Sequence, residues 1–119
     1  MSRILLVDDD EDMLAMVERW LTKEGYEVVK AVSGPAALEA LSASIPDLVL
    51  LDYMMPGMDG PAVLKEIRAN EEWTNIPVLY RTGMEDTELG AGGGEARPDG
   101  IAPKSGGKPG LMKAIEAVL

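Results

Sequence analysis

The chain contains no cysteine and no histidine among its 119 residues. The lack of cysteine excludes a disulfide framework and thiolate metal ligands. The lack of histidine removes the commonest residue of zinc sites, haem sites and catalytic triads. Functions that depend on sulfur or imidazole chemistry are therefore disfavoured.

Long hydrophobic runs are also lacking. The opening apolar run, Ile4 to Val7, has only four residues and leads directly into the acidic run from Asp8 to Asp12. A signal peptide needs a longer apolar stretch, and a membrane helix needs a longer one still. We expect a soluble, cytoplasmic protein that does not engage a membrane.

Positive charge is scarce, with 11 Lys and Arg against 21 Asp and Glu and a formal net charge of -10. This balance disfavours direct nucleic-acid binding, which requires basic residues that displace counterions from phosphates. It suits a domain that gathers carboxylates around a metal. Hydrophobic residues make up 46% of the chain, enough for the core of one domain over residues 1–119.

Short apolar runs alternate with helical patterns along the chain. Strands are predicted at residues 3–7, 27–32, 47–51, 77–82 and 100–103. Helical stripes are formed by Met13, Leu14, Val17 and Leu21; by Ala37, Leu38, Leu41 and Ile45; by Val63, Leu64 and Ile67; and by Leu111, Met112, Ile115 and Leu119. This alternation predicts an α/β fold with a five-stranded parallel sheet that is doubly wound, with helices on both faces.

Residues 84–99 break the alternation where a fourth helix would be expected. Gly90 and Gly92 to Gly94 each cost a helix about 1 kcal/mol relative to alanine. We expect a fourth helix that is short or disordered, with at most one helical turn at residues 85–89 before a mobile loop.

Polar side chains follow the ends of four predicted strands. Ligands of doubly wound sheets bind beyond the carboxyl ends of the strands, so these side chains should converge. They are Asp8 and Asp9, Asp52, Thr82 with Gly83, and Lys104. Three carboxylates, a hydroxyl and an ammonium are therefore predicted to share one edge of the sheet.

The predicted carboxylates require a counter-charge. Two carboxylates about 4 Å apart repel by roughly 4 kcal/mol at an effective dielectric constant of 20. Oxygen ligands of this kind select Mg²⁺, with Mn²⁺ or Ca²⁺ as possible substitutes. Asp52 could then act as a nucleophile towards a phosphoryl group. Lys104, Thr82 and the Gly83 amide could contact the phosphoryl oxygens.

Two sequence blocks carry a resemblance to a known family, namely ILLVDDD at residues 4–10 and DYMMPGMDG at residues 52–60. IPVL at 76–79 leads into Thr82, which lies 82 − 52 = 30 positions after Asp52, and Lys104 lies 104 − 82 = 22 further on. The chain resembles, over essentially its whole length, the receiver domain of bacterial two-component response regulators. The resemblance implies a flavodoxin-like fold and a signalling switch, not a turnover enzyme.

The resemblance also implies roles for single residues. Asp52 would be the phosphoacceptor, Asp9 would bind Mg²⁺ directly with the assistance of Asp8, and the Met54 carbonyl would add a backbone ligand. Thr82 and Lys104 would sense the phosphoryl group. The donor would be a phosphohistidine on a sensor histidine kinase or phosphotransfer protein, and the output would pass to a downstream protein partner or to an output domain beyond this chain.

The sequence departs from the family pattern in its second half. Ser105 follows Lys104 where the family has a cis proline. A cis bond before a non-proline residue costs about 2.5–4 kcal/mol, which favours a trans peptide with a reoriented lysine, but the sequence leaves the isomer open. Ile101 occupies the position of an aromatic switch residue. Arg81 places a charge in a strand that the family keeps apolar, so we expect one face of this strand to be poorly covered. The switch is then expected to order residues 84–99.

Three alternatives stay open at this point. The chain could be a degenerate receiver that acts as a phosphorylation-independent interaction module. It could be a metal-dependent phosphohydrolase, although Met54 stands where such enzymes place an acid. Lys108, which precedes Pro109, could replace Lys104, but the spacing favours Lys104.

Overall fold

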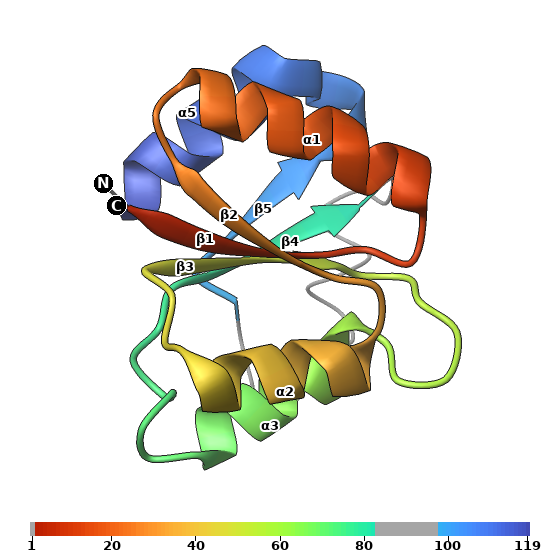
Figure 1. Cartoon of the computed structure of the whole chain (residues 1–119), viewed down its shortest axis with the longest axis vertical. Helices are drawn as coiled ribbons and strands as arrows, with labels where there is room; N and C mark the ends of the chain where they lie inside the picture. Colours follow the sequence, from red (N-terminus) through yellow and green to blue (C-terminus); the bar gives the residue numbers. More distant parts are fainter. Residues whose placement is uncertain (1, 83–97) are drawn as a thin grey trace.

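A five-stranded parallel sheet lies between two layers of helices in the computed structural model, which describes residues 2–82 and 98–119 (Figure 1). The elements in chain order are β1 (Arg3–Val7), α1 (Glu11–Lys23), β2 (Glu27–Ala31), α2 (Gly34–Ala43), β3 (Leu48–Asp52), α3 (Gly60–Ala69), β4 (Val78–Thr82), β5 (Gly100–Pro103), the 3₁₀ turn η1 (Lys104–Gly106) and α5 (Gly107–Val118). Helices α1 and α5 cover one face of the sheet, and α2 and α3 cover the other. The predicted fold class is confirmed.

The strand order is β2-β1-β3-β4-β5, and every neighbouring pair is parallel. The carboxyl ends of all five strands therefore meet at one edge of the sheet. The strand order reverses at β1, because β2 is added on one side of β1 and β3 to β5 are added on the other. This is the kind of edge at which doubly wound sheets bind ligands.

The core divides into two clusters because side chains alternate along each strand. In β1, Leu5 and Val7 pack with α2 and α3, whereas Ile4 and Leu6 pack with α1 and α5. Strand β3 is buried along its whole length, as its continuous apolar sequence predicts. The strands at the centre of the sheet thus hold their terminal carboxylates on a rigid support.

Helix termini follow the expected capping chemistry. Ser33 caps α2 by accepting a hydrogen bond from the Ala36 amide at 3.2 Å. Asp59 caps α3 in the same way through the Ala62 amide at 3.0 Å. Gly25 follows the end of α1 with a φ of 92°, a conformation that glycine adopts without strain.

Three expectations from the sequence are wrong. Ile45 and Leu119 lie outside the helices and are exposed, because α2 ends at Ala43 before Pro46 and α5 ends at Val118. The face of β4 that carries Arg81 is also well covered, since every residue of β4 is buried. Leu79, on that face, packs into the cluster formed with α1 and α5.

Residues 83–97 are not described. The predictions for the Gly83 amide, for a helical turn at 85–89 and for a loop that the switch orders therefore lie outside the described residues. Among the helices in residues 2–82 and 98–119, none has the length and apolar character that a membrane span requires.

Two glycines with open space around them should respond oppositely to alanine. Among the described residues, no atom lies within 4 Å of a Cβ built on Gly110 in α5 or on Gly57 in the loop before α3. Gly110→Ala should stabilise the fold by about 0.5–1 kcal/mol through helix propensity. Gly57→Ala should destabilise it by about 1 kcal/mol or more, because Gly57 has a φ of 76°. Urea unfolding of both variants tests this, and a gain in stability for Gly57→Ala would contradict it.

Candidate functional site

Three carboxylates meet at the carboxyl edge of the sheet. Asp8, Asp9 and Asp52 each offer an oxygen, and these atoms lie within 4.8 Å of one another. Val7 of β1 pairs in register with Leu51 of β3, so the acids that follow arrive side by side. The predicted convergence of the acidic residues is confirmed.

The turn after β1 holds the first two acids in place. The Asp8 amide donates to the carbonyl of Ala31 at 3.1 Å, which extends the ladder beyond β1. The Asp8 carboxylate accepts from the Asp10 amide at 3.0 Å. Asp10 caps α1 through the amides of Asp12 and Met13. The acidic run thus serves both as a helix cap and as the wall of the site.

Asp52 is buried, with 3% of its surface exposed, and this burial disfavours its charged form. Desolvation, with the negative charge of Asp8, raises the pKa of Asp52 from 3.8 to about 6, while Lys104 opposes the rise. The Lys104 Nζ lies 3.2 Å from Oδ1 of Asp52. One lysine therefore compensates only part of the charge in this site.

The donor set fits a divalent cation. Three carboxylates offer hard oxygen ligands of the kind that Mg²⁺, Mn²⁺ and Ca²⁺ prefer. Asp8 is 2% exposed and Asp9 is exposed, so the cluster lies at the boundary between core and solvent. A cation would supply the counter-charge that Lys104 alone does not provide.

Lys104 reaches Asp52 without the cis proline of the family. The peptide between Lys104 and Ser105, which the sequence left open, is trans, and Lys104 begins the turn η1. The lysine contacts Asp52 from this conformation. The Nζ atom of Lys108 instead lies 4.0 Å from Oε2 of Glu24, which is not part of the acidic site.

Thr82 and Met54 occupy the same edge with different exposure. Thr82 ends β4, is 1% exposed and pairs in register with Pro103. The Met54 side chain is 66% exposed, in the loop after β3. The roles of the Thr82 hydroxyl and of the Met54 carbonyl stay predictions.

Gly60 allows the loop after β3 to fold back onto Asp52. Its amide donates to the carbonyl of Tyr53 at 3.0 Å. A Cβ at this position would lie 2.8 Å from the carbonyl oxygen of Asp52 and 2.9 Å from the Cα of Tyr53. The start of α3 is therefore packed directly against the backbone of the candidate phosphoacceptor.

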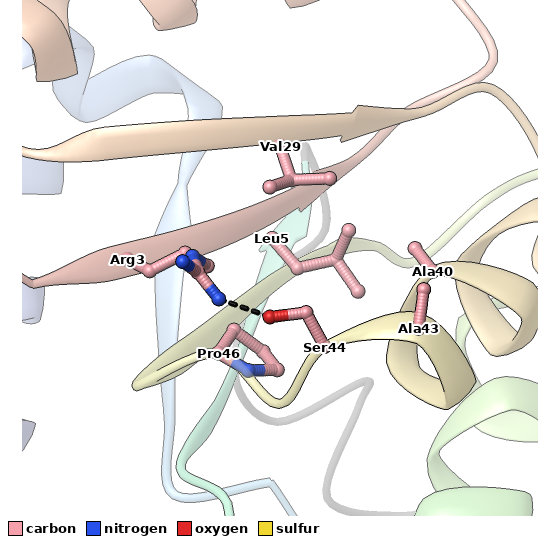
Figure 2. Close-up of a pocket in the computed structure, with 7 residues that line it drawn as sticks. All are labelled: Arg3, Leu5, Val29, Ala40, Ala43, Ser44 and Pro46. Atoms are coloured by element: carbon pink, nitrogen blue, oxygen red, sulfur yellow. Dashed lines mark hydrogen bonds between the residues drawn. The ribbon is translucent and has the colours of Figure 1, made fainter.

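An apolar pocket lies at the other end of the sheet and belongs to a different part of the molecule. It has a volume of about 120 Å³ and lies between the first residues of β1 and the end of α2 (Figure 2). Arg3 donates a hydrogen bond to Ser44 at its margin. Its lining includes Leu5, Val29 and Ala40 and contains no carboxylate.

Fold and site together define a parallel α/β protein with a buried carboxylate, a lysine and an acidic cluster at its carboxyl edge. The model of the response regulator receiver domain matches residues 4–116, and the chain belongs to this family. The chain is 43% identical over 84 residues to the response regulator PleD of Caulobacter vibrioides, a match that covers 71% of the chain and 18% of PleD.

Further relatives match over nearly the whole chain. The transcriptional regulatory protein PrrA of Mycobacterium tuberculosis is 35% identical over 117 residues, which cover 98% of the chain and 49% of PrrA. The solved structure of the chemotaxis response regulator CheY4 of Vibrio cholerae superposes with a TM-score of 0.93 at 29% identity, covering 100% of the chain and 99% of CheY4. The chain spans about half or less of the length of the curated relatives it matches.

Asp52→Asn should stabilise the metal-free protein at neutral pH. Because the pKa of Asp52 is raised to about 6, ionisation of this group opposes folding above that pH, and the penalty vanishes below about pH 4. In EDTA at pH 7.5 we expect a gain of about 1–3 kcal/mol, and a much smaller gain at pH 4. Urea unfolding at both pH values measures this. Asp9→Asn, at the exposed acid, should give the smaller gain, and an equal Asp52→Asn gain at both pH values would contradict the prediction.

Gly60→Ala should disturb the site more than Gly34→Ala. A Cβ on Gly60 meets backbone atoms of Asp52 and Tyr53. The three atoms nearest to a Cβ on Gly34 are the Cβ, Cγ and Sδ of Met58, each at 2.8 Å, so Met58 in the loop must shift, whereas the backbone at the end of β3 is not met. We expect Gly60→Ala to destabilise the fold by about 1–3 kcal/mol and Gly34→Ala by less. Urea unfolding compares the two, and equal losses would contradict the assignment.

Proposed function

We propose that this receiver domain is a phospho-accepting switch in which Asp52 receives the phosphoryl group. The observation that carries the proposal is the position of Asp52, buried at the end of β3 beside Asp8 and 3.2 Å from the Lys104 ammonium. A buried carboxylate with a lysine at one oxygen is suited to a nucleophile whose new negative charge is neutralised in place.

The proposed step transfers a phosphoryl group from a histidine nitrogen to a carboxylate oxygen. An oxygen of ionised Asp52 attacks phosphorus, and the bond between phosphorus and the imidazole nitrogen breaks with its electron pair passing to nitrogen. An acyl phosphate remains on Asp52. Lys104 then pairs with the phosphoryl oxygens as a point charge.

The surrounding residues take supporting roles in this proposal. Asp8, Asp9, Asp52 and the Met54 carbonyl would hold Mg²⁺, and a bound cation would supply positive charge to the phosphoryl oxygens. Thr82 and the Gly83 amide donate hydrogen bonds to the phosphoryl group. The trans peptide after Lys104 leaves the lysine within reach of Asp52.

The proposed partners follow from this chemistry. The donor is a phosphohistidine on a sensor histidine kinase or phosphotransfer protein in the cytoplasm. The output passes to a downstream protein or to an output domain beyond this chain. Receiver domains are signalling modules, and the only reactions proposed for this chain are its own phosphorylation and dephosphorylation.

Intact mass spectrometry tests the proposal directly. With Mg²⁺ and a small acyl phosphate, the protein should gain the mass of one phosphoryl group, and Asp52→Asn or EDTA should prevent this gain. Lys104→Met should slow the reaction on the order of 10²-fold, because a positioned donor to the developing charge is lost. Lys108→Met serves as the control, since this lysine lies beside Glu24. An unmodified wild-type protein would instead support a phosphorylation-independent interaction module.

A further inference from the structure

Arg81 is a buried charge on the strand next to Asp52. Only 4% of its surface is exposed, and its Nε and Nη1 atoms have no hydrogen-bond partner within the part of the chain that the structure describes. Its carbonyl accepts from the Tyr53 amide at 3.1 Å, which fixes its backbone to the residue after Asp52. Burying a guanidinium whose N–H groups make no hydrogen bond costs folding free energy. Nearby negative charges could offset part of this cost.

The strand register places Arg81 beside the acidic pair. Arg81 pairs with Asp52 across β3 and β4, and parallel partners in register point to the same face of the sheet. Val7 pairs with Leu51, so Asp8 and Asp52 are likewise neighbours on that face. Asp8, Asp52 and Arg81 therefore form one row across three adjacent strands, about 4.8 Å apart from strand to strand.

The acids offset part of the cost of burying the guanidinium. Burial lowers the pKa of Arg81, and the negative charges of Asp8 and Asp52 counteract only part of this lowering. The guanidinium carbon also lies 5.9 Å from the ring centre of Trp20 in α1, within the range of a cation–π contact. Within the described residues Arg81 forms no ion pair shorter than 4.0 Å, so its guanidinium lies over Trp20 on the face that α1 covers and acts on Asp8 and Asp52 at longer range.

We propose that Arg81 is a positioning residue that compensates the charges of Asp8 and Asp52 from within the core, and so weakens the affinity of the site for a divalent cation. This inference rests on the proposed function for its role in phosphorylation. Lys104 approaches Asp52 from the solvent edge, whereas Arg81 acts from the α1 and α5 face. The two buried acids can then remain together before a cation arrives.

Calorimetric titration with Mg²⁺ tests the compensation. Arg81→Met removes the charge but keeps an unbranched side chain, and it should tighten Mg²⁺ binding roughly three- to tenfold, because repulsion of the cation is lost. Arg81→Lys keeps the charge and should bind Mg²⁺ as the wild type does. Arg19→Met removes an exposed arginine of α1 and controls for net charge. Mg²⁺ binding by Arg81→Met that is unchanged or weaker would overturn the proposal.

A double-mutant cycle in EDTA gives a second test that needs neither metal nor phosphate. Asp52→Asn should raise the folding equilibrium constant roughly two- to tenfold more in the Arg81→Met background than in the wild type. The reason is that Asp52 in the Arg81→Met background lacks the positive charge of Arg81, so its neutralisation relieves a larger repulsion. Arg81→Gln provides a second neutral background if Arg81→Met does not fold. Equal effects of Asp52→Asn in both backgrounds would overturn the inference.

The two proposals fail in different ways. A wild-type protein that takes no phosphoryl group contradicts the proposed function, but the cycle in EDTA still reports whether Arg81 compensates Asp52. A double-mutant cycle that shows no coupling between Arg81 and Asp52 contradicts the role of Arg81, but it leaves the proposed phosphorylation of Asp52 unaffected.

Discussion

Repulsion among the carboxylates at the edge of the sheet is the interaction on which the rest of the structure depends. Asp8, Asp9 and Asp52 approach within 4.8 Å, and two of the three are buried. Burial and the charge of Asp8 together raise the pKa of Asp52 to about 6. A stable fold must therefore supply positive charge to this edge. Lys104 does so at 3.2 Å, and a divalent cation would complete the neutralisation.

The parallel topology creates the repulsion and also fixes its geometry. Two neighbouring strands with apolar runs are buried inside the sheet; Asp8 directly follows β1, and Asp52 is the last residue of β3. Their register leaves no freedom for Asp8 and Asp52 to separate, because a shift by one residue would turn every apolar side chain to the wrong face. The packing of the core thus holds the two carboxylates together despite their mutual repulsion.

Local patterns in the sequence were sufficient for most of the fold and for the acidic site. The apolar runs that lead into Asp8 and Asp52 predicted both the parallel strands and their meeting edge. The position of Lys104 after the last strand predicted its place at that edge, and the structure adds its contact with Asp52. The helix predictions failed at Ile45 and Leu119, where apolar periodicity continues past the end of a helix. The burial of Arg81 was missed because it depends on Trp20, which is distant in sequence and comes close only through the packing of α1. Periodicity carries no information about such a contact.

The burial of Arg81 changes the meaning of its departure from the family pattern. A charge in an apolar strand was expected to mark a weakly covered face, yet β4 is buried throughout and Arg81 lies in register with Asp52. A lone buried cation would destabilise the core, whereas the negative charges of Asp8 and Asp52 offset part of the cost of burying Arg81. Arg81 is therefore unfavourable as a charged residue in an apolar strand, but favourable as a positive charge near two buried carboxylates. Its position in the row of Asp8, Asp52 and Arg81 explains why a buried arginine is compatible with this strand.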